Sequence, residues 1–454
     1  MIKPKSMKFY GLKQLDKILQ SYNISSDEIF STKVVANVLP FRTNNYVVEE
    51  LIDWNNIPND PMYQLTFMQH GMLKDEYFNQ MADLIRSEAP QDEIKKLANE
   101  IRLALNPHPA GQLTANVPFM EDDNEPVPGV QHKYKETCLV FPSAGQTCHA
   151  YCTFCFRWAQ FVGMNDLKFA TDESKRFQKY LSQHKEVTDV LFTGGDPMIM
   201  TYDKLKAYIE PLLSPEFEHI RNIRIGTKSI SYWPYKYVTD KDSSDILHLF
   251  EEVVKAGKHL AIMAHFNHWV ELTTKVSREA IRNIRNTGAE IRTQSPLIKH
   301  INDDPNVWAT MWKEQVKLGI IPYYFFIERD TGAVEYFAVP IARAFQIFRD
   351  AFTQVSGLSR TVRGPSMSAN PGKVAVEGIT EINGEKVFVL NFLQARNPDW
   401  VKRPFFAKFD AEATWLDRLE PAFGQEKFFF QDEFDSMLSE KDEHFDKLAS
   451  FGAA

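Results

Sequence analysis

Short apolar runs alternate with amphipathic stretches through the middle of the chain. The apolar runs predict strands at 187–192, 220–227, 259–266, 289–295 and 321–328. The segments between them, at 202–213, 245–257, 277–288 and 307–319, repeat apolar residues every three to four positions and predict helices. Such alternation gives parallel strands joined by right-handed crossover helices. We therefore expect an α/β fold built as a full or partial barrel, with its chemistry at the carboxyl ends of the strands.

The regions on either side of this alternation have different patterns. Residues 1–105 repeat apolar positions at helical spacing and predict a helical N-terminal region. Residues 106–136 are rich in Pro, Gly, Asn and Asp and predict an extended connector to a barrel over 137–350. A Gly/Pro/Ser loop and a β-hairpin with Asn383-Gly384 at its turn are expected over 351–395, and a small C-terminal extension over 396–454.

Composition and charge exclude several classes of protein. Apolar residues make up 44% of the 454 positions and charged residues 25%, which is typical of a folded chain. The net charge of −8 and the lack of any Lys/Arg-rich run argue against a nucleic-acid partner. The N-terminus lacks an apolar signal core, and no stretch approaches the roughly 20 apolar residues needed to cross a bilayer. We expect a cytoplasmic protein without a membrane partner.

Three of the four cysteines, Cys148, Cys152 and Cys155, fall within eight consecutive positions. Three thiolates can ligate three irons of a [4Fe–4S] cluster and leave the fourth iron open. The amino and carboxylate groups of S-adenosylmethionine can chelate that open iron, which brings the sulfonium close enough to accept an electron. The alternatives are unrelated buried cysteines, or a zinc site completed by His149, although the chain has no second Cys/His knuckle. Cys138 is expected to be a small buried apolar residue.

Polar residues at two strand ends are candidates for binding a ligand. Gly194, Gly195 and Asp196 follow a predicted strand, and the glycines would let the backbone approach a ligand and offer carbonyls to its ammonium group. The alternative is a plain turn. Gln294 ends another strand and could hydrogen-bond an adenosine, or cap the strand. The three-residue spacing of His265 and His268 is a poor match for a metal pair at a strand end, where side chains alternate between faces.

With these residues in place, the chain resembles the lysine 2,3-aminomutase family of radical S-adenosylmethionine enzymes. The resemblance covers roughly residues 100–395 and rests on NEPVPGVQHKYKE, the cysteine motif, TGGDP, AHFNH, TQSPLIKHINDDPN, GIIPYYFF and VSGLSR. It implies a partial (βα)6 radical SAM barrel that uses a [4Fe–4S] cluster, S-adenosyl-L-methionine and pyridoxal 5′-phosphate to move an α-amino group to the β-carbon. It also implies an amino acid substrate, a reductant such as flavodoxin or ferredoxin, and a homo-oligomer.

The resemblance assigns roles to four further residues. Lys373, in the loop 366–373, matches the family's catalytic lysine, which forms the Schiff base with pyridoxal phosphate. By default a lysine in such a loop is a solvated surface residue. Arg157 matches the arginine that grips the substrate carboxylate. Tyr134 and Lys133 match a Tyr and an Arg near the cofactor phosphate, and the lysine weakens bidentate binding there.

Two positions that select the substrate side chain depart from the family. Arg329 and Ser366 stand where lysine-specific members have aspartates, which favours a substrate with an acidic side chain such as glutamate. A lysine 2,3-aminomutase in which Asp330 takes the vacated place is the competing interpretation. A radical enzyme without pyridoxal phosphate and a non-catalytic protein with a structural metal also fit the motifs. The family's C-terminal zinc-binding cysteines are absent, so the resemblance implies no zinc and a different subunit contact.

Overall fold

The computed structural model describes residues 2–111, 113–114, 116–164, 168–171 and 174–439. Its main feature is an eleven-stranded sheet in the order β13-β12-β11-β10-β9-β8-β7-β6-β5-β4-β3. Neighbours from β4 to β10 are parallel. The strands of the sheet are β3 Val130–Tyr134, β4 Thr137–Val140, β5 Asp189–Phe192, β6 Asn222–Thr227, β7 His259–His265, β8 Glu290–Leu297, β9 Ile321–Ile327, β10 Arg363–Ser368, β11 Gly372–Ile382, β12 Glu385–Ala395 and β13 Phe405–Lys408.

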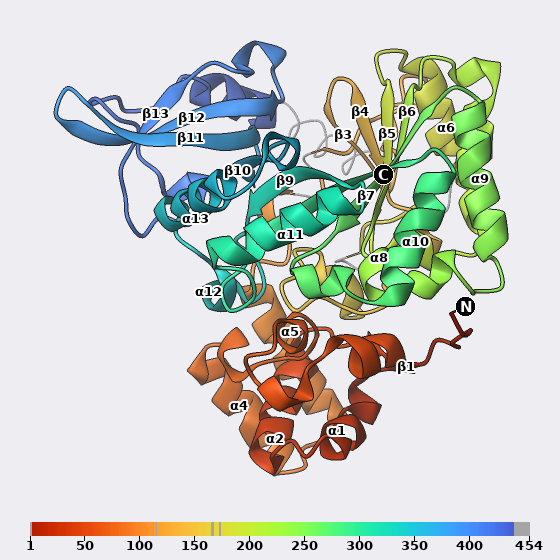
Figure 1. Ribbon diagram of the computed structural model, residues 1–454. Helices are drawn as coiled ribbons and strands as arrows, with labels where there is room; N and C mark the ends of the chain where they lie inside the picture. The colour runs from red at the N-terminus through yellow and green to blue at the C-terminus, as the bar shows by residue number, and fades with distance from the viewer. Residues whose placement is uncertain (1, 112, 115, 165–167, 172–173, 440–454) are drawn as a thin grey trace, which may run out of the picture.

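Helices connect the parallel strands and cover the outside of the sheet (Figure 1). They are α6 Ser174–Gln183, α7 Tyr202–Ile209, α8 Ser229–Tyr232, α9 Ser243–Lys255, α10 Lys275–Asn286, α11 Pro305–Lys317, α12 Val334–Phe337 and α13 Ile341–Thr353. Each longer helix buries one apolar stripe, such as Ile246, Leu249 and Val253 of α9. Because β4 and β10 do not pair, the six βα units from β4 to α13 form an open barrel. The predicted α/β fold with a partial (βα)6 barrel is confirmed.

The N-terminal region is helical, as its pattern predicts, and lies against one end of the barrel (orange to red in Figure 1). Its elements are β1 Phe9–Tyr10, α1 Leu12–Ser21, α2 Ser26–Val38, β2 Thr43–Asn44, α3 Pro61–Thr66, α4 Asp75–Arg86 and α5 Gln91–Ala104. Its apolar core continues into the barrel, where it includes Phe154, Trp158 and Tyr232. The N-terminal region therefore packs directly on the segment that carries the cysteines. Among the described residues, no helix combines the length and apolarity that a membrane span needs.

The segment after α13 differs from its prediction as a loop. Residues 363–368 form β10, which pairs with barrel strand β9 on one side and with β11 on the other. Lys373 is therefore on a strand, opposite Ser368. Local sequence could not indicate this, because pairing with distant strands decides the conformation of a Ser/Pro/Gly segment. The hairpin of β11 and β12 is as predicted, with Asn383 (φ 53°) and Gly384 (φ 84°) at its turn. The predicted connector also contains β3.

Candidate cluster and cofactor site

The three cysteines of the motif line one cavity of about 150 Å³. They lie on the loop after β4, and the carboxyl ends of β5, β6 and β7 also line the cavity. Gln294 lines it from within β8, which continues to Leu297, so the prediction that Gln294 ends its strand is wrong. Burial raises the pKa of all three thiols, that of Cys155 to about 12, and a thiolate at Cys152 would raise the pKa of Cys148 and Cys155 further. Three neighbouring cysteines whose thiolates are disfavoured by burial fit a site for a metal cluster, because the positive charge of the metal stabilises thiolates.

Two glycines allow the cysteine loop to lie against the end of β5. A Cβ on Gly195 would be 2.5 Å from both the backbone N and O of Thr147, the residue before Cys148. A Cβ on Gly194 would be 2.2 Å from the side-chain nitrogen of Gln146. The glycines line the cavity, and because they have no side chain the cysteine loop can pack against them. That these glycines bring the backbone close to a ligand stays a prediction. Their contact with the cysteine loop is a second reason for glycine at both positions.

Asp196 is buried at the same edge, and the protein already uses both its carboxylate oxygens. One accepts hydrogen bonds from Met198 N and Thr227 Oγ1, and the other accepts from Lys228 N. His149 lies next to it, with Nδ1 3.7 Å from the carboxylate, and does not line the cavity. Asp196 therefore fixes the strand ends, and His149 lies outside the lining of the cavity that the cysteines share.

Gln294 and His265 are paired residues on neighbouring strands, and both line the cavity. The Gln294 side-chain nitrogen lies 3.0 Å from Nε2 of His265, and burial lowers the pKa of His265 to about 3. His265 is therefore neutral, with Nε2 accepting this hydrogen bond. His268 instead caps a short helix by accepting from Val270 N, and burial lowers its pKa to about 4. The two histidines therefore have different hydrogen-bond partners.

A second part of the site lies where the hairpin meets the barrel. The Nζ of Lys373 is 4.0 Å from the centre of the Tyr324 ring and within reach of Gln394 Oε1 at 3.2 Å. Burial, with the charges of Arg224 and Arg363, lowers the pKa of Lys373 to about 7. Much of this amine is therefore neutral near pH 7, as a nucleophile toward a carbonyl must be. Lys373 is not a solvated surface lysine.

Positive charges surround the space beside Lys373. Lys133 donates to the backbone oxygen of Ala369 at 2.6 Å, and burial together with Arg396, Arg329 and Lys373 lowers its pKa well below the usual value. Tyr134 lies within the field of the same two arginines. A concentration of cations of this kind is costly without an anion. These residues fit a phosphate-bearing cofactor.

Two guanidinium groups lie between the cysteines and the lysine. Arg157 is buried against the Phe141 ring, and Arg329, at the end of β9, donates to the backbone oxygen of Ser368 at 2.7 Å. Both cations approach the ring of Phe156, and burial and the charge of Arg329 lower the pKa of Arg157 to about 9. Within the described part of the chain, neither guanidinium forms an ion pair with a carboxylate.

The two acidic neighbours of Arg329 in the sequence have different surroundings. Asp330 lines a different cavity, formed with Leu105 and Tyr336 on the side of the N-terminal region. Burial raises the pKa of Glu328 well above its ordinary value, while the charge of Arg329 lowers it. Ser366 is fully buried on β10 and on the same face as Lys373, since it lies two residues from Ser368.

Sequence patterns did not single out several residues that the fold brings to this site. Lys228 and Tyr232 line the cysteine cavity, Arg363 lies near Lys373, and Arg396 lies near Lys133. Lys228 directly follows the last residue of β6, so the rule for strand ends could have identified it. Tyr232 lies in a segment with no such signal. Arg396 does follow a strand, β12, but this strand belongs to the antiparallel hairpin, to which the barrel rule does not apply.

Comparison with known proteins gives relatives over most of the chain. A protein of Aquifex aeolicus named "Putative L-lysine 2,3-aminomutase" is 32% identical over 395 residues, 87% of this chain and 91% of its own. The L-lysine 2,3-aminomutase of Acetoanaerobium sticklandii is 27% identical over 68% of this chain and 71% of its own. The glutamate 2,3-aminomutase of Clostridioides difficile is 26% identical over 53% and 54%, respectively.

Family models and solved structures add little. No protein-family model matches the chain. A radical SAM methyltransferase structure from Sphaerobacter thermophilus covers 78% of this chain and 93% of its own at 13% identity, with a TM-score of 0.38, too low to bear on the fold. The identity and coverage of the Aquifex aeolicus relative decide the assignment. The chain belongs to the lysine 2,3-aminomutase family of radical S-adenosylmethionine enzymes.

Proposed function

We propose that this aminomutase acts on an amino acid whose side chain ends in a carboxylate, with glutamate as the first candidate. The observation that carries the proposal is the pair Arg157 and Arg329, two guanidinium groups that share the ring of Phe156 and have no carboxylate ion pair among the described residues. Like charges held close together in a dry site favour binding of anions. A dicarboxylate substrate would supply one anion to each.

The chain is a radical S-adenosylmethionine aminomutase, and its cofactors are a [4Fe–4S] cluster, S-adenosylmethionine and pyridoxal phosphate. When bound, they supply a radical that removes a hydrogen from the β-carbon and a carbonyl that carries the amino group between carbons. The protein supplies position, charge and exclusion of water. Cys148, Cys152 and Cys155 would hold the cluster. Gly194, Gly195 and Asp196 after β5, together with Gln294 of β8, would form the wall for S-adenosylmethionine.

The hairpin side of the site would hold the other cofactor. Lys373 would present a neutral amine, because burial and two nearby arginines lower its pKa to about 7. Lys133 and Tyr134 would lie near the phosphate, together with Arg396. This set has a single amine in Lys133 where the family has a planar guanidinium, and Arg396 already donates from Nε and Nη2 to Asn370 and Asn116, so Arg396 would add positive charge near the phosphate.

Arg157 and Arg329 would fix the two ends of the substrate. Arg157, close to the cysteines, would bind the α-carboxylate, and Arg329, beside Ser368, would bind the side-chain carboxylate. Asp330 faces another cavity, so the proposal does not place it where it could attract a basic side chain. Ser366 would add a neutral hydroxyl where an aspartate would favour lysine. Holding both ends limits the substrate to one orientation at the radical.

The test is a comparison of substrates under anaerobic conditions. Reconstituted enzyme with S-adenosylmethionine, pyridoxal phosphate and dithionite is incubated separately with L-glutamate, L-aspartate and L-lysine, and the β-amino isomers are separated by chromatography and identified by mass. We expect the glutamate isomer and no lysine isomer. Conversion of lysine alone would overturn the acidic substrate while leaving the aminomutase assignment in place. Arg343→Gln, an exposed arginine on α13, serves as the charge-matched control for Arg329→Gln.

A further inference from the structure

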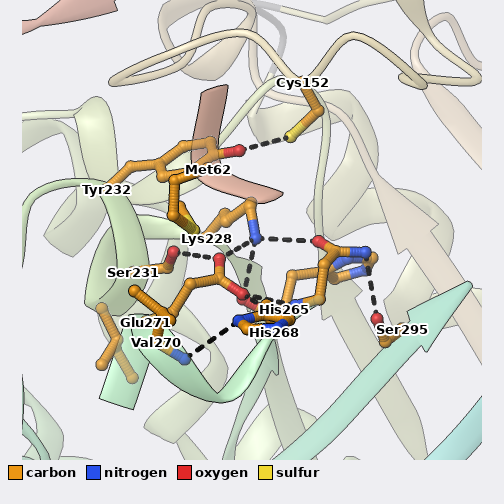
Figure 2. Close-up of polar contacts among 12 residues, drawn as sticks. Met62, Cys152, Lys228, Ser231, Tyr232, His265, His268, Val270, Glu271 and Ser295 are labelled. Carbon is orange, nitrogen blue, oxygen red and sulfur yellow. Dashed lines mark hydrogen bonds and ion pairs between the residues drawn. The ribbon is translucent and has the colours of Figure 1, made fainter. Parts of the chain in front are cut away.

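The hydroxyl of Tyr232 is directed at one of the three cysteine sulfurs. Its Oη lies 3.4 Å from Sγ of Cys152, within hydrogen-bonding distance for sulfur (Figure 2). Tyr232 is 1% exposed, and within the described residues Cys152 is the hydrogen-bond partner of its hydroxyl. A thiolate that ligates iron has no proton to give, so in the loaded site the phenol must be the donor.

The short helix that carries Tyr232 is fixed from two directions. Asn44 of the N-terminal region donates from its side-chain nitrogen to the backbone oxygens of both Tyr232 and His149, at 2.9 Å each. Ser231, the preceding residue, donates its hydroxyl to the fully buried carboxylate of Glu271. One amide therefore joins the tyrosine to the cysteine loop, and the position of the phenol relative to Cys152 is set by the fold.

A buried cation lies over the same phenol. Lys228 Nζ is 4.6 Å from the centre of the Tyr232 ring and is held by Glu271 at 2.5 Å and Asn267 Oδ1 at 2.9 Å (Figure 2). A positive charge at a ring face draws electron density from the hydroxyl and makes it a better donor. Lys228 also lines the cavity into which Cys152 faces, so the phenol hydroxyl and the ammonium group both favour negative charge on the Cys152 sulfur.

We propose that Tyr232 is a positioning residue for the cluster, and that its hydrogen bond to Cys152 raises the reduction potential of the cluster. Lys228 strengthens that hydrogen bond. The inference rests on the cluster in the proposed function. One electron from an external reductant takes the cluster from its 2+ to its 1+ state and increases the negative charge on its sulfurs. A donor to one sulfur stabilises the reduced state more than the oxidised state, so reduction becomes easier.

The test is a redox titration of Tyr232→Phe followed by electron paramagnetic resonance of the reduced cluster. Dithionite and mediators set the potential, and S-adenosylmethionine is left out so that turnover does not contribute. We expect a lower midpoint potential, with the reduced-to-oxidised ratio at a fixed potential falling about tenfold, which is 59 mV for one electron. Tyr237→Phe is the matched control, because it removes an equally buried phenol hydroxyl that bonds Ser229 instead of a cysteine.

A second variant tests the same bond in the opposite direction. Replacing Tyr232 by 3-fluorotyrosine keeps the ring and makes its hydroxyl a stronger donor, so the midpoint should rise. Equal midpoints for wild type and Tyr232→Phe, at equal iron content, would overturn the inference. So would a shift of the same size in Tyr237→Phe, since that would indicate a general packing effect. Wild-type protein that holds no iron after reconstitution would contradict the cluster itself, which is a different failure and is read from iron analysis.

Discussion

The amine of Lys373 lies 4.0 Å from the centre of the Tyr324 ring, so a side chain of the appended hairpin contacts a side chain of barrel strand β9. The site therefore has two halves with different origins. The cysteines and strand ends belong to the barrel, whereas the lysine comes from a hairpin that extends the barrel sheet through β10. Arg329, at the end of β9, joins the halves through its bond to Ser368.

Replacing Lys373 by alanine should abolish stable binding of pyridoxal phosphate. The substitution removes the half-buried amine that is available to a carbonyl, while Lys133 is already engaged by the Ala369 oxygen. Dialysis followed by the visible absorbance of the retained cofactor measures the loss, which should exceed tenfold. Lys386→Ala is the control, since this lysine is on the same hairpin but packs on Phe409. Equal retention by the two variants would contradict the role of Lys373.

The rate of cofactor loading should depend on pH through Lys373. Its pKa is lowered to about 7, so the fraction of neutral amine falls as the pH drops below 7 and levels off above it. An ordinary lysine would instead gain reactivity up to about pH 10.4. Stopped-flow absorbance after mixing the unloaded protein with pyridoxal phosphate at successive pH values gives the profile. A rate that keeps rising tenfold per pH unit from 7 to 9 would contradict a lowered pKa.

Much of the barrel was predictable because its elements are local in sequence. The strand over 220–227 and the helix over 245–257 carry their burial pattern in their own residues, and the structure contains both as β6 and α9. The hairpin turn at Asn383-Gly384 follows from the need for positive φ at both positions. Wherever the next few residues decided the conformation, the sequence pattern was sufficient.

The details of the site were less predictable because they depend on distant pairings. Arg329 and Asp330 are adjacent residues just after β9, yet they face different parts of the molecule. Arg329 donates to Ser368, whereas Asp330 lines the cavity that Leu105 also lines. Sequence alone left both arrangements open. Similarly, the contact of Tyr232 with Cys152 joins segments 80 residues apart, through a helix of one turn that has no periodic signal. Resemblance supplied candidate residues, and the fold supplied their orientations.

Arg329→Gln should weaken use of an acidic substrate far more than it changes stability. A charged hydrogen bond to a carboxylate contributes about 1.5–3 kcal/mol, so kcat/KM for glutamate should fall by roughly 10- to 150-fold. The effect should appear mainly in KM, because the side-chain carboxylate does not react. Steady-state rates on glutamate, beside thermal melts, measure both quantities. An unchanged KM would mean that Arg329 does not contact the substrate.

Gly195→Ala should reduce iron loading by displacing the cysteine loop. The added methyl group would lie 2.5 Å from the backbone of Thr147, which cannot move without shifting Cys148. Overpacking of this kind costs about 1–3 kcal/mol. Iron content after identical reconstitution should fall, while Gly357→Ala, which has open space around it, should match wild type. Full iron loading in Gly195→Ala would show that the loop adapts to the methyl group.

Asn44→Ala should show that the N-terminal region supports the cluster site. The side-chain nitrogen of Asn44 donates to the backbone oxygens of His149 and Tyr232, and its oxygen accepts from Tyr46 N and Val47 N. Leaving such buried groups unpaired costs about 1–3 kcal/mol each, and the cysteine loop and the Tyr232 helix then lose their common anchor.

The readouts for this variant are iron content and the melting temperature, and both should fall. Asn45→Ala is the neighbouring control, because among the described residues that side chain bonds the backbone of Lys8 and Ser6 near the N-terminus. It should keep its iron. If Asn45→Ala lost as much iron as Asn44→Ala, the effect would reflect general loosening of the N-terminal region. A loss confined to Asn44→Ala would mean that one amide couples the helical region to the cysteine loop, since no hydrogen bond of the Asn45 side chain reaches that loop within the described residues.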